Sequence, residues 1–381
     1  MKVVIAPQSF KGSISALDAA KAMEEGVKRV VSDAETVLVP VADGGDGTLE
    51  TLVEATNGEI RSATVTGPIG KPVMAEWGAL GDGETAMIEM ARTSGLALLS
   101  LDERDPLRAT TFGLGEVIRE ALDAGFRSFI VGIGGSATND AGAGMAQALG
   151  VRLLDESGND LPPGGAALAA LHHIDTSGLD APAVEAQFSV ACDVSNPLTG
   201  PEGASAVYGP QKGATPELVE QLDAALRNFA RIVERDIGKS INDVPGSGAA
   251  GGLGGGMMSF LGGSLRAGVD IVLDQVGLDD KLEGADLVIT GEGQLDFQTV
   301  YNKAPIGVAW RARERGIPVV AVSGSLGQGF EDVHAEGIDA VASIVSAPMS
   351  LEEASTRGEE LLADAAAEAM RFMKVGSRVF G

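Results

Sequence analysis

Short apolar runs in this chain repeatedly end in turns rich in Gly, Ser, Asp and Asn, and most of these turns lead into a helix-like stretch. Four such runs cover residues 37–42, 129–133, 287–290 and 319–322. An apolar strand followed by a turn and a helix is typical of a parallel α/β sheet. The turns then lie at the carboxyl ends of the strands, where such sheets bind ligands. The pattern therefore predicts a small-molecule site built from several strand ends.

The order of the predicted elements indicates two α/β domains. The two end regions share one pattern, with strands at 2–6, 36–41, 286–290, 318–323 and 340–345 and helices at 15–31, 48–56, 303–315 and 350–373. The middle begins instead with a strand meander, and its predicted strands are 59–65, 72–80, 85–90, 128–133 and 190–194, with helices at 111–124, 140–149 and 216–237. We therefore predict a discontinuous, doubly wound parallel-sheet domain of residues 1–67 plus 285–381, and an inserted α/β domain of residues 68–284.

The glycine-rich stretch from Gly246 to Gly263 is predicted to form an active-site loop or a linker around a tight helix. Its first glycines match the spacing of a dinucleotide-binding motif, and Asp270 follows about 20 residues later. That motif requires a strand directly before it, and residues 241–245 do not have the pattern of one. We therefore do not expect a dinucleotide site there.

Composition narrows the class of partner and the location. The formal net charge of −26 argues against nucleic acid and against an anionic membrane surface, because both are bound by Lys and Arg. No segment approaches about 18 uninterrupted apolar residues, and the run at residues 3–6 is too short for a signal peptide. We therefore expect a cytoplasmic enzyme. The single cysteine, Cys192, excludes a disulfide within the chain, and the three histidines lack metal-ligand spacing.

The turns together carry the groups that phosphoryl transfer requires, namely cations or N–H groups for the phosphoryl, carboxylates for Mg²⁺, and a carboxylate near the attacking hydroxyl. The candidate carboxylates are Asp43, Asp46, Asp140, Asp193, Glu292 and Asp296. The candidate cations are Lys11, Lys212 and Lys303. The groups that could bind hydroxyl or carboxylate oxygens are Ser9, Ser136, Thr138, Asn139, Asn196 and Gln211. This set predicts an enzyme that handles phosphate.

Each candidate also has a purely structural interpretation. Asp and Asn in Gly-rich turns often satisfy only the local backbone, and Asp140 could be an ordinary helix N-cap. Lys11 could be a solvated turn lysine. Asp193 ends an apolar strand, where a charge is costly without a partner, so we favour function there. We interpret the neighbouring Cys192 as a small core residue.

Six segments at these turns carry a resemblance to a known family. They are residues 4–7 (VIAP) with 9–11 (SFK), 39–48 (VPVADGGDGT), 132–145 (GIGGSATNDAGAGM), 192–198 (CDVSNPL), 208–214 (YGPQKGA) and 291–296 (GEGQLD). In these segments, which follow the family's order along nearly the whole chain, the protein resembles the glycerate kinases of bacterial glyoxylate and sugar-acid catabolism. Two positions depart from the family pattern, Gln8 in place of a common Asp and Asn302 in place of a usual Gly.

The resemblance implies a fold and a reaction. The fold would be a flavodoxin-like domain plus a second α/β domain, with the active-site cleft between them. The reaction would be ATP-dependent phosphorylation of D-glycerate to phosphoglycerate, with ATP and Mg²⁺ as cofactors. We expect 2-phosphoglycerate rather than 3-phosphoglycerate, although the sequence leaves open which hydroxyl reacts. It also leaves open the oligomeric state, for which a homodimer is one candidate.

Within this interpretation each candidate has an expected role. Asp193 would position or deprotonate the substrate hydroxyl, with Asp296 as its rival. Lys11 with Ser9, and the turn from Ser136 to Asp140, would hold the phosphoryl group or the glycerate carboxylate. The metal or hydroxyl ligands would be Asp43, Asp46 and Glu292, while Lys212 and Lys303 would offset the charge of nucleotide or substrate.

Other functions remain alternatives at this point. The first is a kinase for another small hydroxy acid. The second is a non-catalytic sensor that binds a nucleotide or metabolite on the same fold, because a fold does not determine a function. A dehydrogenase is third. Carboxylates at several strand ends favour catalysis over simple binding.

Overall fold

The structure is a computed structural model that describes residues 1–45, 47–301 and 303–380. The chain forms two compact units, the first of Met1–Asn57 with Val269–Gly381 and the second of Gly58–Gly268. The sequence analysis placed these boundaries at 67/68 and 284/285. The earlier first boundary follows from strand β3 (Glu59–Thr66), which pairs with β4 (Pro72–Ala79) of the second unit. That the units are separate domains stays a prediction.

The first unit is built on a sheet of five parallel strands in the order β15-β13-β11-β1-β2. Its strands are β1 (Lys2–Pro7), β2 (Glu35–Leu38), β11 (Leu287–Gly291), β13 (Val319–Ser323) and β15 (Ala340–Ser343). Read by position along the chain this is the order 2-1-3-4-5 of flavodoxin-like sheets, in which the connections change direction between the first and third strands. The carboxyl ends of β1 and β11 therefore mark the place where such a fold binds its ligand.

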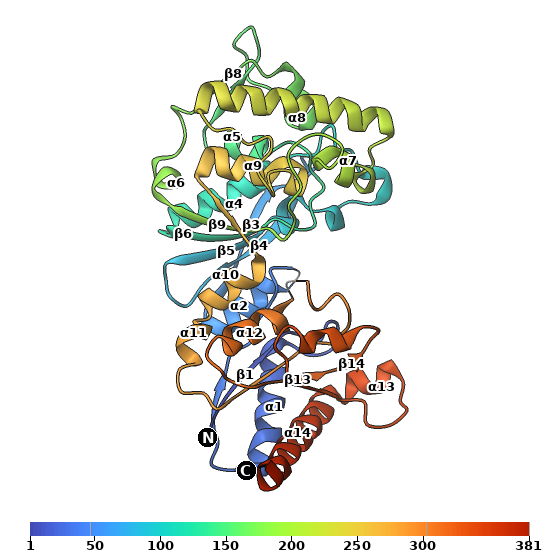
Figure 1. Ribbon diagram of the computed structural model, residues 1–381. Coiled ribbons are helices and arrows are strands. Elements are labelled where there is room, and N and C mark those ends of the chain that lie inside the picture. The colour runs from blue at the N-terminus through green and yellow to red at the C-terminus, as the bar shows by residue number, and fades with distance from the viewer. Residues whose placement is uncertain (46, 302, 381) are drawn as a thin grey trace. The chain divides into compact units, whose positions relative to one another are not determined.

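Helices cover this sheet on both faces. Helices α1 (Ala16–Val30) and α14 (Gly358–Phe380) lie side by side on one face (Figure 1). They approach closely because α1 has a glycine at the contact: an added Cβ on Gly26 would lie 2.2 Å from the carbonyl oxygen of Ala363. Helix α12 (Ala304–Arg313) contacts β1, β11 and β13 and contributes nothing to the core cluster that α1 and α14 share. The doubly wound arrangement is the one predicted.

The second unit contains a six-stranded sheet in the order β10-β9-β6-β5-β4-β3. The strands that pair in parallel are β5 (Thr85–Glu89), β6 (Ser128–Gly132), β9 (Gln187–Ala191) and β10 (Ser264–Arg266). Strand β4 pairs antiparallel with both β3 and β5. Helices α4 (Phe112–Asp123), α5 (Ala143–Ala148), α8 (Pro216–Ile237) and α9 (Ala249–Leu261) lie on one side of this sheet (Figure 1). The fold class is α/β in both units, as predicted.

The glycine-rich stretch is mostly a buried helix, so the tight helix of the second alternative is confirmed and the loop of the first is not. Helix α9 occupies most of it and contains a kink at Ala250, Gly251 and Gly252. The glycines allow its backbone to touch the turn that follows β6. An added Cβ on Gly251 would lie 2.0 Å from the Thr138 carbonyl oxygen, and one on Gly256 would lie 2.2 Å from that of Ala141.

Smaller differences have local causes. Strand β2 ends at Leu38 instead of residue 41, two residues before Pro40, which has no N–H for a ladder hydrogen bond. The predicted last helix is two helices, α13 (Leu351–Thr356) and α14, which Arg357 separates. At the start of α1, the N–H of Asp18 donates to Ser15 Oγ at 3.1 Å, so Ser15 caps the helix.

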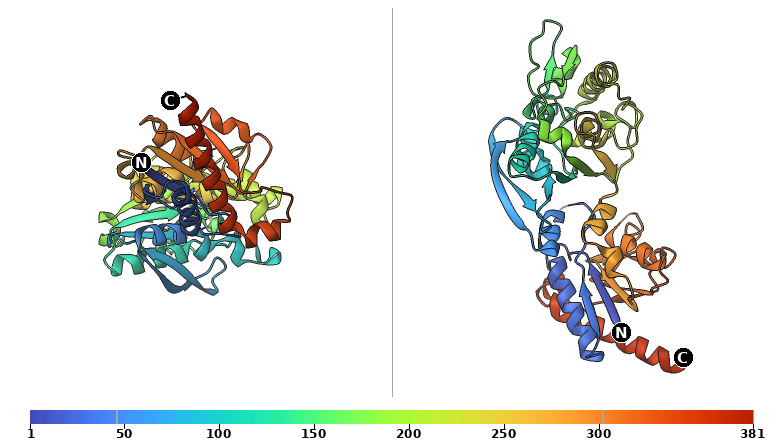
Figure 2. Two further views of the ribbon diagram at one scale, coloured as in Figure 1. Left: turned by 90° about the horizontal axis from the view of Figure 1, so that it is seen from below. Right: turned by 90° about the vertical axis from the view of Figure 1, so that its left-hand side faces the viewer.

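The remaining elements are short. They are α2 (Thr48–Thr56), α3 (Ala91–Ser94), β7 (Arg152–Leu154), β8 (His173–Asp175), α6 (Ala181–Glu185), α7 (Ala204–Tyr208), α10 (Gly268–Gln275), α11 (Leu278–Lys281), β12 (Gln294–Leu295) and β14 (Ser325–Leu326). In Figure 2 the end of α14 extends past the sheet of its own unit, where Phe372 and Val375 are exposed. In the described part of the chain, no helix combines the length and the apolar character that crossing a bilayer requires.

Candidate active site

Glu292 follows β11 directly, at the edge where sheets of this topology bind ligands. Its side chain is 8% exposed, and Oε1 accepts a hydrogen bond from Thr299 Oγ1 at 2.8 Å. Burial raises the pKa of Glu292 to about 7; the neighbouring carboxylates of Asp43 and Asp296 raise it further, and Thr299 and Lys303 lower it. A carboxylate with this environment accepts a cation readily, because a cation offsets the cost of its buried charge.

Asp43 and Lys303 form the adjoining charged pair. Lys303 Nζ lies 3.7 Å from Asp43 Oδ2, and the two side chains are 37% and 21% exposed, respectively. Residues 39–42 carry Asp43 to this place, because the Val39 N–H donates to Ile5 O at 2.8 Å and the chain continues beside β1. The other predicted ligand of this turn, Asp46, lies outside the described residues.

Thr299 is a site residue that the sequence analysis missed. Its hydroxyl donates to the Glu292 carboxylate and accepts from the Asp296 backbone N–H at 3.0 Å, so it links the Glu292 side chain to the backbone of Asp296. Asp296 itself accepts from Gln298 N at 2.8 Å and from Gln294 Nε2 at 3.0 Å. The spacing of Asp296 and Thr299, three residues apart in a turn, is the signal that could have found it.

The segment after β1 supplies the other predicted groups of this unit. Ser9 is half-buried and Lys11 is exposed. An added Cβ on Gly293 would lie 3.6 Å from the Lys11 backbone nitrogen, so this segment lies against the residue that follows Glu292. Of the two departures from the family pattern, Gln8 has a buried Oε1 with no partner within the described chain, and Asn302 lies outside the described residues.

The donor set of this edge fits Mg²⁺. Among the described residues no three His, Cys, Asp or Glu side chains gather as a ready metal cage. Magnesium in phosphate-transferring enzymes is commonly held by one or two carboxylates together with substrate phosphates and water. Glu292 and Asp43, which interact electrostatically, provide such a pair.

In the second unit, the turn after β6 has the opposite character. Its predicted binding residues Ser136, Thr138, Asn139 and Asp140 are all buried. Asp140 accepts four hydrogen bonds, from Thr111 N at 2.8 Å, Thr111 Oγ1 at 2.9 Å, and the N–H groups at positions 142 and 144, both at 3.2 Å. Burial raises the pKa of Asp140, and these hydrogen bonds oppose the rise. Asp140 therefore organises the turn and the start of α5.

Lys212 is also buried, with 1% of its surface exposed. Its ammonium group donates to Ser136 Oγ at 2.8 Å and to the Thr138 carbonyl oxygen at 2.6 Å. Burial lowers the pKa of Lys212 to about 7, while Asp140 acts in the opposite direction. Direct contact of this ammonium with nucleotide or substrate stays a prediction; the geometry favours a role in fixing the turn.

The exposed part of this turn consists of two glycines. Gly134 and Gly135 are exposed, and an added Cβ on Gly134 would meet nothing within 4 Å. Their N–H groups have no hydrogen-bond acceptor in the described part of the chain. Consecutive N–H groups at the end of a strand form a concave site that suits an anion.

Asp193, which follows β9, is exposed, so the argument that its charge lies deep in the fold is wrong. The strand ends at Ala191, two residues before it, and Asp193 Oδ1 accepts from the Gly268 N–H at 2.9 Å. An exposed carboxylate at a strand end is accessible to a substrate hydroxyl. Burial raises the pKa of Cys192, and its Sγ lies 3.3 Å from Val194 O, which fits a half-buried core thiol.

Two further predicted binding residues differ in availability. Asn196 is engaged on both sides of its amide, donating to Glu202 O at 2.8 Å and accepting from the Tyr208 hydroxyl at 2.7 Å. Gln211 is exposed, and its backbone carbonyl oxygen accepts from Arg104 Nη1 at 2.9 Å. Asn196 therefore stabilises its loop, whereas the Gln211 side chain faces solvent.

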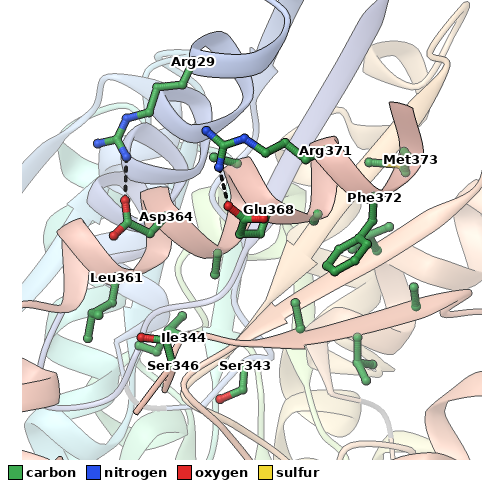
Figure 3. A pocket seen from close by; sticks show the side chains of 17 residues that line it. Arg29, Ser343, Ile344, Ser346, Leu361, Asp364, Glu368, Arg371, Phe372 and Met373 are labelled. Atoms are coloured by element: carbon green, nitrogen blue, oxygen red, sulfur yellow. Dashed lines mark hydrogen bonds and ion pairs between the residues drawn. The ribbon is translucent and has the colours of Figure 1, made fainter. Parts of the chain in front are cut away.

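A cavity of about 810 Å³ in the first unit lies away from these strand-end groups, between α14 and the face of β15 (Figure 3). Its charged side chains are already paired. Arg29 Nη1 lies 2.7 Å from Asp364 Oδ1, and Arg371 is bonded to Glu368. This cavity offers no unpaired group for phosphate chemistry among its charged lining residues.

The chain matches known proteins over its whole length. The model of the glycerate kinase family matches residues 3–374. The chain belongs to the glycerate kinase family. It is thus an enzyme, a phosphotransferase with an alcohol group as acceptor.

Individual members of the glycerate kinase family show how close the relation is. The glycerate kinase of Bacillus subtilis (strain 168) is 50% identical, and the glycerate 2-kinase of Escherichia coli (strain K12) is 46% identical, each over 100% of both chains. The crystal structure of a candidate glycerate kinase 2 from Salmonella typhimurium LT2 has a TM-score of 0.92 and 49% identity, and the match covers 99% of each chain. The protein therefore shares the fold of this crystal structure in both of its units.

Proposed function

We propose that this enzyme transfers the γ-phosphoryl group of ATP to the C2 hydroxyl of D-glycerate and releases 2-phosphoglycerate. The observation that carries the proposal is the match to the glycerate kinase family over residues 3–374. The choice of C2 draws on the relative from Escherichia coli that is named glycerate 2-kinase. The reaction would belong to organic-acid, glyoxylate or sugar-acid catabolism in the cytoplasm.

The first unit supplies the groups for the nucleotide in this proposal. Glu292 and Asp43 would hold Mg²⁺, which neutralises charge on the phosphates when it is bound. Lys303 lies 3.7 Å from Asp43, close enough to contribute positive charge at the same edge. Lys11 and Ser9, which follow β1, would contact the transferred phosphoryl group.

The second unit supplies the groups for glycerate. The consecutive N–H groups of Gly134 and Gly135 suit the substrate carboxylate, because both residues are exposed and these N–H groups have no acceptor in the described part of the chain. Asp193 would accept the proton of the attacking hydroxyl, which requires it to be ionised at neutral pH. Asp296 remains its rival. Lys212 and Asp140 would act on the reaction only through the shape of the turn.

The test is ³¹P NMR of the products formed from D-glycerate, ATP and Mg²⁺. We expect stoichiometric 2-phosphoglycerate and ADP. A 3-phosphoglycerate signal would keep the kinase but move the attacking oxygen to C3. Intact ATP after incubation with active-site-titrated protein would overturn D-glycerate as the substrate.

A further inference from the structure

A second, smaller cavity of about 180 Å³ opens at the carboxyl ends of β1, β11, β13 and β15 in the first unit. We call it the strand-end pocket. Three of its walls are buried apolar side chains, namely Phe10, Ile14 and Ile344. The other apolar lining residues are Met349, Ala354 and the more exposed Val345 and Leu351. A ligand group that enters this pocket must therefore be largely apolar.

The polar groups of the strand-end pocket are few, and most are already bonded. The Ser13 hydroxyl donates to Ser355 O at 3.1 Å, and the Ser350 hydroxyl accepts from Glu353 N at 3.1 Å. Among the described residues, the one hydrogen-bond partner of Ser325 Oγ is Gln294 Oε1, at a long 3.4 Å. Its hydroxyl can therefore turn toward a ligand at little cost. A largely apolar pocket with an available hydroxyl such as that of Ser325 suits a heteroaromatic ring.

The pocket adjoins the backbone of the turn that carries Glu292. Gly293 and Gly324 both line it, and the Gly324 N–H donates to the Glu292 carbonyl oxygen at 3.1 Å. Lys11 lies on the pocket rim, with its backbone beside Gly293. A molecule with a flat apolar end in the pocket would therefore place an anionic end beside the Lys11 cation and the Glu292 carboxylate.

Two other cavities lack this combination. The cavity of about 790 Å³ in the second unit is lined by the carboxylates of Asp102, Glu103 and Asp105 with Arg108, which disfavours a polyphosphate. The cavity of Figure 3 has its arginines paired with acidic side chains. Glycerate itself offers no apolar surface for the strand-end pocket.

We propose that the strand-end pocket binds the purine base of ATP, with the triphosphate running past Lys11 toward Glu292. This rests on the proposed function, because it takes ATP as the phosphoryl donor. The Ser325 hydroxyl would hydrogen-bond the edge of the base, and the apolar walls would cover its faces. The pocket would thus set the preference for a purine nucleotide.

The test is isothermal titration of ADP into Ala354→Phe, in which the new ring fills the pocket. We expect ADP affinity to fall at least about tenfold and the KM for D-glycerate to stay within about twofold of wild type. The matched control is Ala365→Phe, another helical alanine, which lines the cavity of Figure 3. It should leave ADP affinity unchanged. Unchanged ADP affinity in folded Ala354→Phe would overturn the pocket assignment.

A second variant guards against misfolding, which circular dichroism and the urea midpoint would reveal in Ala354→Phe. Ser325→Ala removes only the hydroxyl and should weaken ADP about threefold and reduce the preference for ATP over CTP. An unchanged ATP preference would contradict the role of Ser325 in base recognition. Wild-type protein that binds no ADP and forms no phosphoglycerate would instead defeat the proposed function itself, so the two failures are distinguishable.

Discussion

The turn after β11 in the first unit and the turn after β6 in the second arise from one sequence pattern but differ in structure. Both follow a buried apolar strand and contain glycines and a carboxylate. Glu292 accepts one hydrogen bond from the described protein groups, from Thr299, and has Asp43, Asp296 and Lys303 near it. Asp140 accepts four hydrogen bonds and lies wholly inside the fold.

The difference shows how the supply of local donors decides what a turn carboxylate does. Backbone and hydroxyl donors satisfy the charge of Asp140, and these hydrogen bonds stabilise the turn. Glu292 has few protein donors and a raised pKa, so it gains most from an external cation. Mutation of the carboxylate in the turn after β11 should therefore reduce catalysis. Mutations that disturb the turn after β6 should reduce stability.

Glu292→Gln should give the largest effect on the catalytic side. The amide keeps the size of the side chain but loses the negative charge that would hold Mg²⁺, so we expect turnover to fall about 10³-fold. Steady-state kinetics with saturating D-glycerate and ATP measures it. Glu331→Gln, at an exposed glutamate of the same unit, is the matched control and should keep wild-type turnover.

Gly251→Ala should give the largest effect on stability. The residue has φ +70°, and an added Cβ would lie 2.0 Å from the Thr138 carbonyl oxygen, so the turn after β6 must move. We expect a loss of about 3 kcal/mol in the free energy of unfolding, measured with urea. In Gly262→Ala a similar φ of +63° is combined with open space, and the loss should be only about 1 kcal/mol. Equal losses in the two variants would refute close contact as the cause.

Asp193→Asn tests whether exposed carboxylates of the second unit act in catalysis even though its buried ones do not. We expect turnover to fall about 10²-fold, with the KM for D-glycerate largely kept, because the amide cannot take the hydroxyl proton. The unfolding midpoint should not change, since the side chain is exposed. Near-wild-type turnover would remove Asp193 from the role and favour Asp296.

Two buried groups should make the free energy of unfolding depend on pH with opposite signs. They are Lys212, which donates to the turn after β6, and Glu292 in the turn after β11. Lys212 has a pKa of about 7 against 10.5, so between these values the unfolded chain binds more protons and stability rises with pH. In metal-free protein Glu292 has a pKa of about 7 against 4.5, so stability falls as pH rises through that window. Each slope is at most about 1.4 kcal/mol per pH unit.

Urea titrations at several pH values measure these slopes. Lys212→Met should flatten the curve only above pH 7, and Glu292→Gln only below it. A steep dependence above pH 7 that survives in Lys212→Met would show that the ammonium group is not buried as described.

Much of the fold was predictable from sequence because periodicity and turn residues act locally. The apolar runs gave every strand of the first sheet, and α8 begins at Pro216 and ends at Ile237 as expected. The glycine-rich α9 was not predictable as a buried helix. Gly251 and Gly256 are required by backbone contacts with Thr138 and Ala141, which lie more than a hundred positions away, and such contacts leave no periodic signal.

The candidate site was predictable as a set of residues but not as a set of environments. Sequence placed Glu292, Asp43 and Lys303 at strand ends, and the structure brings them near one another. The sequence alone could not distinguish buried Lys212 from exposed Lys11, since both lie in Gly-containing turns. Burial depends on the packing of distant segments, so the direction in which a turn side chain points is a tertiary property.

The most direct test of the account is the affinity of Mn²⁺, as a substitute for Mg²⁺, in the presence of ADP. Electron paramagnetic resonance of free Mn²⁺ measures this affinity without any turnover. The account predicts that Glu292→Gln weakens Mn²⁺ binding at least about tenfold, while Lys212→Met, in protein that remains folded, leaves it unchanged. Equal Mn²⁺ affinity in wild type and Glu292→Gln would contradict the claim that Glu292, in the turn after β11, holds the metal.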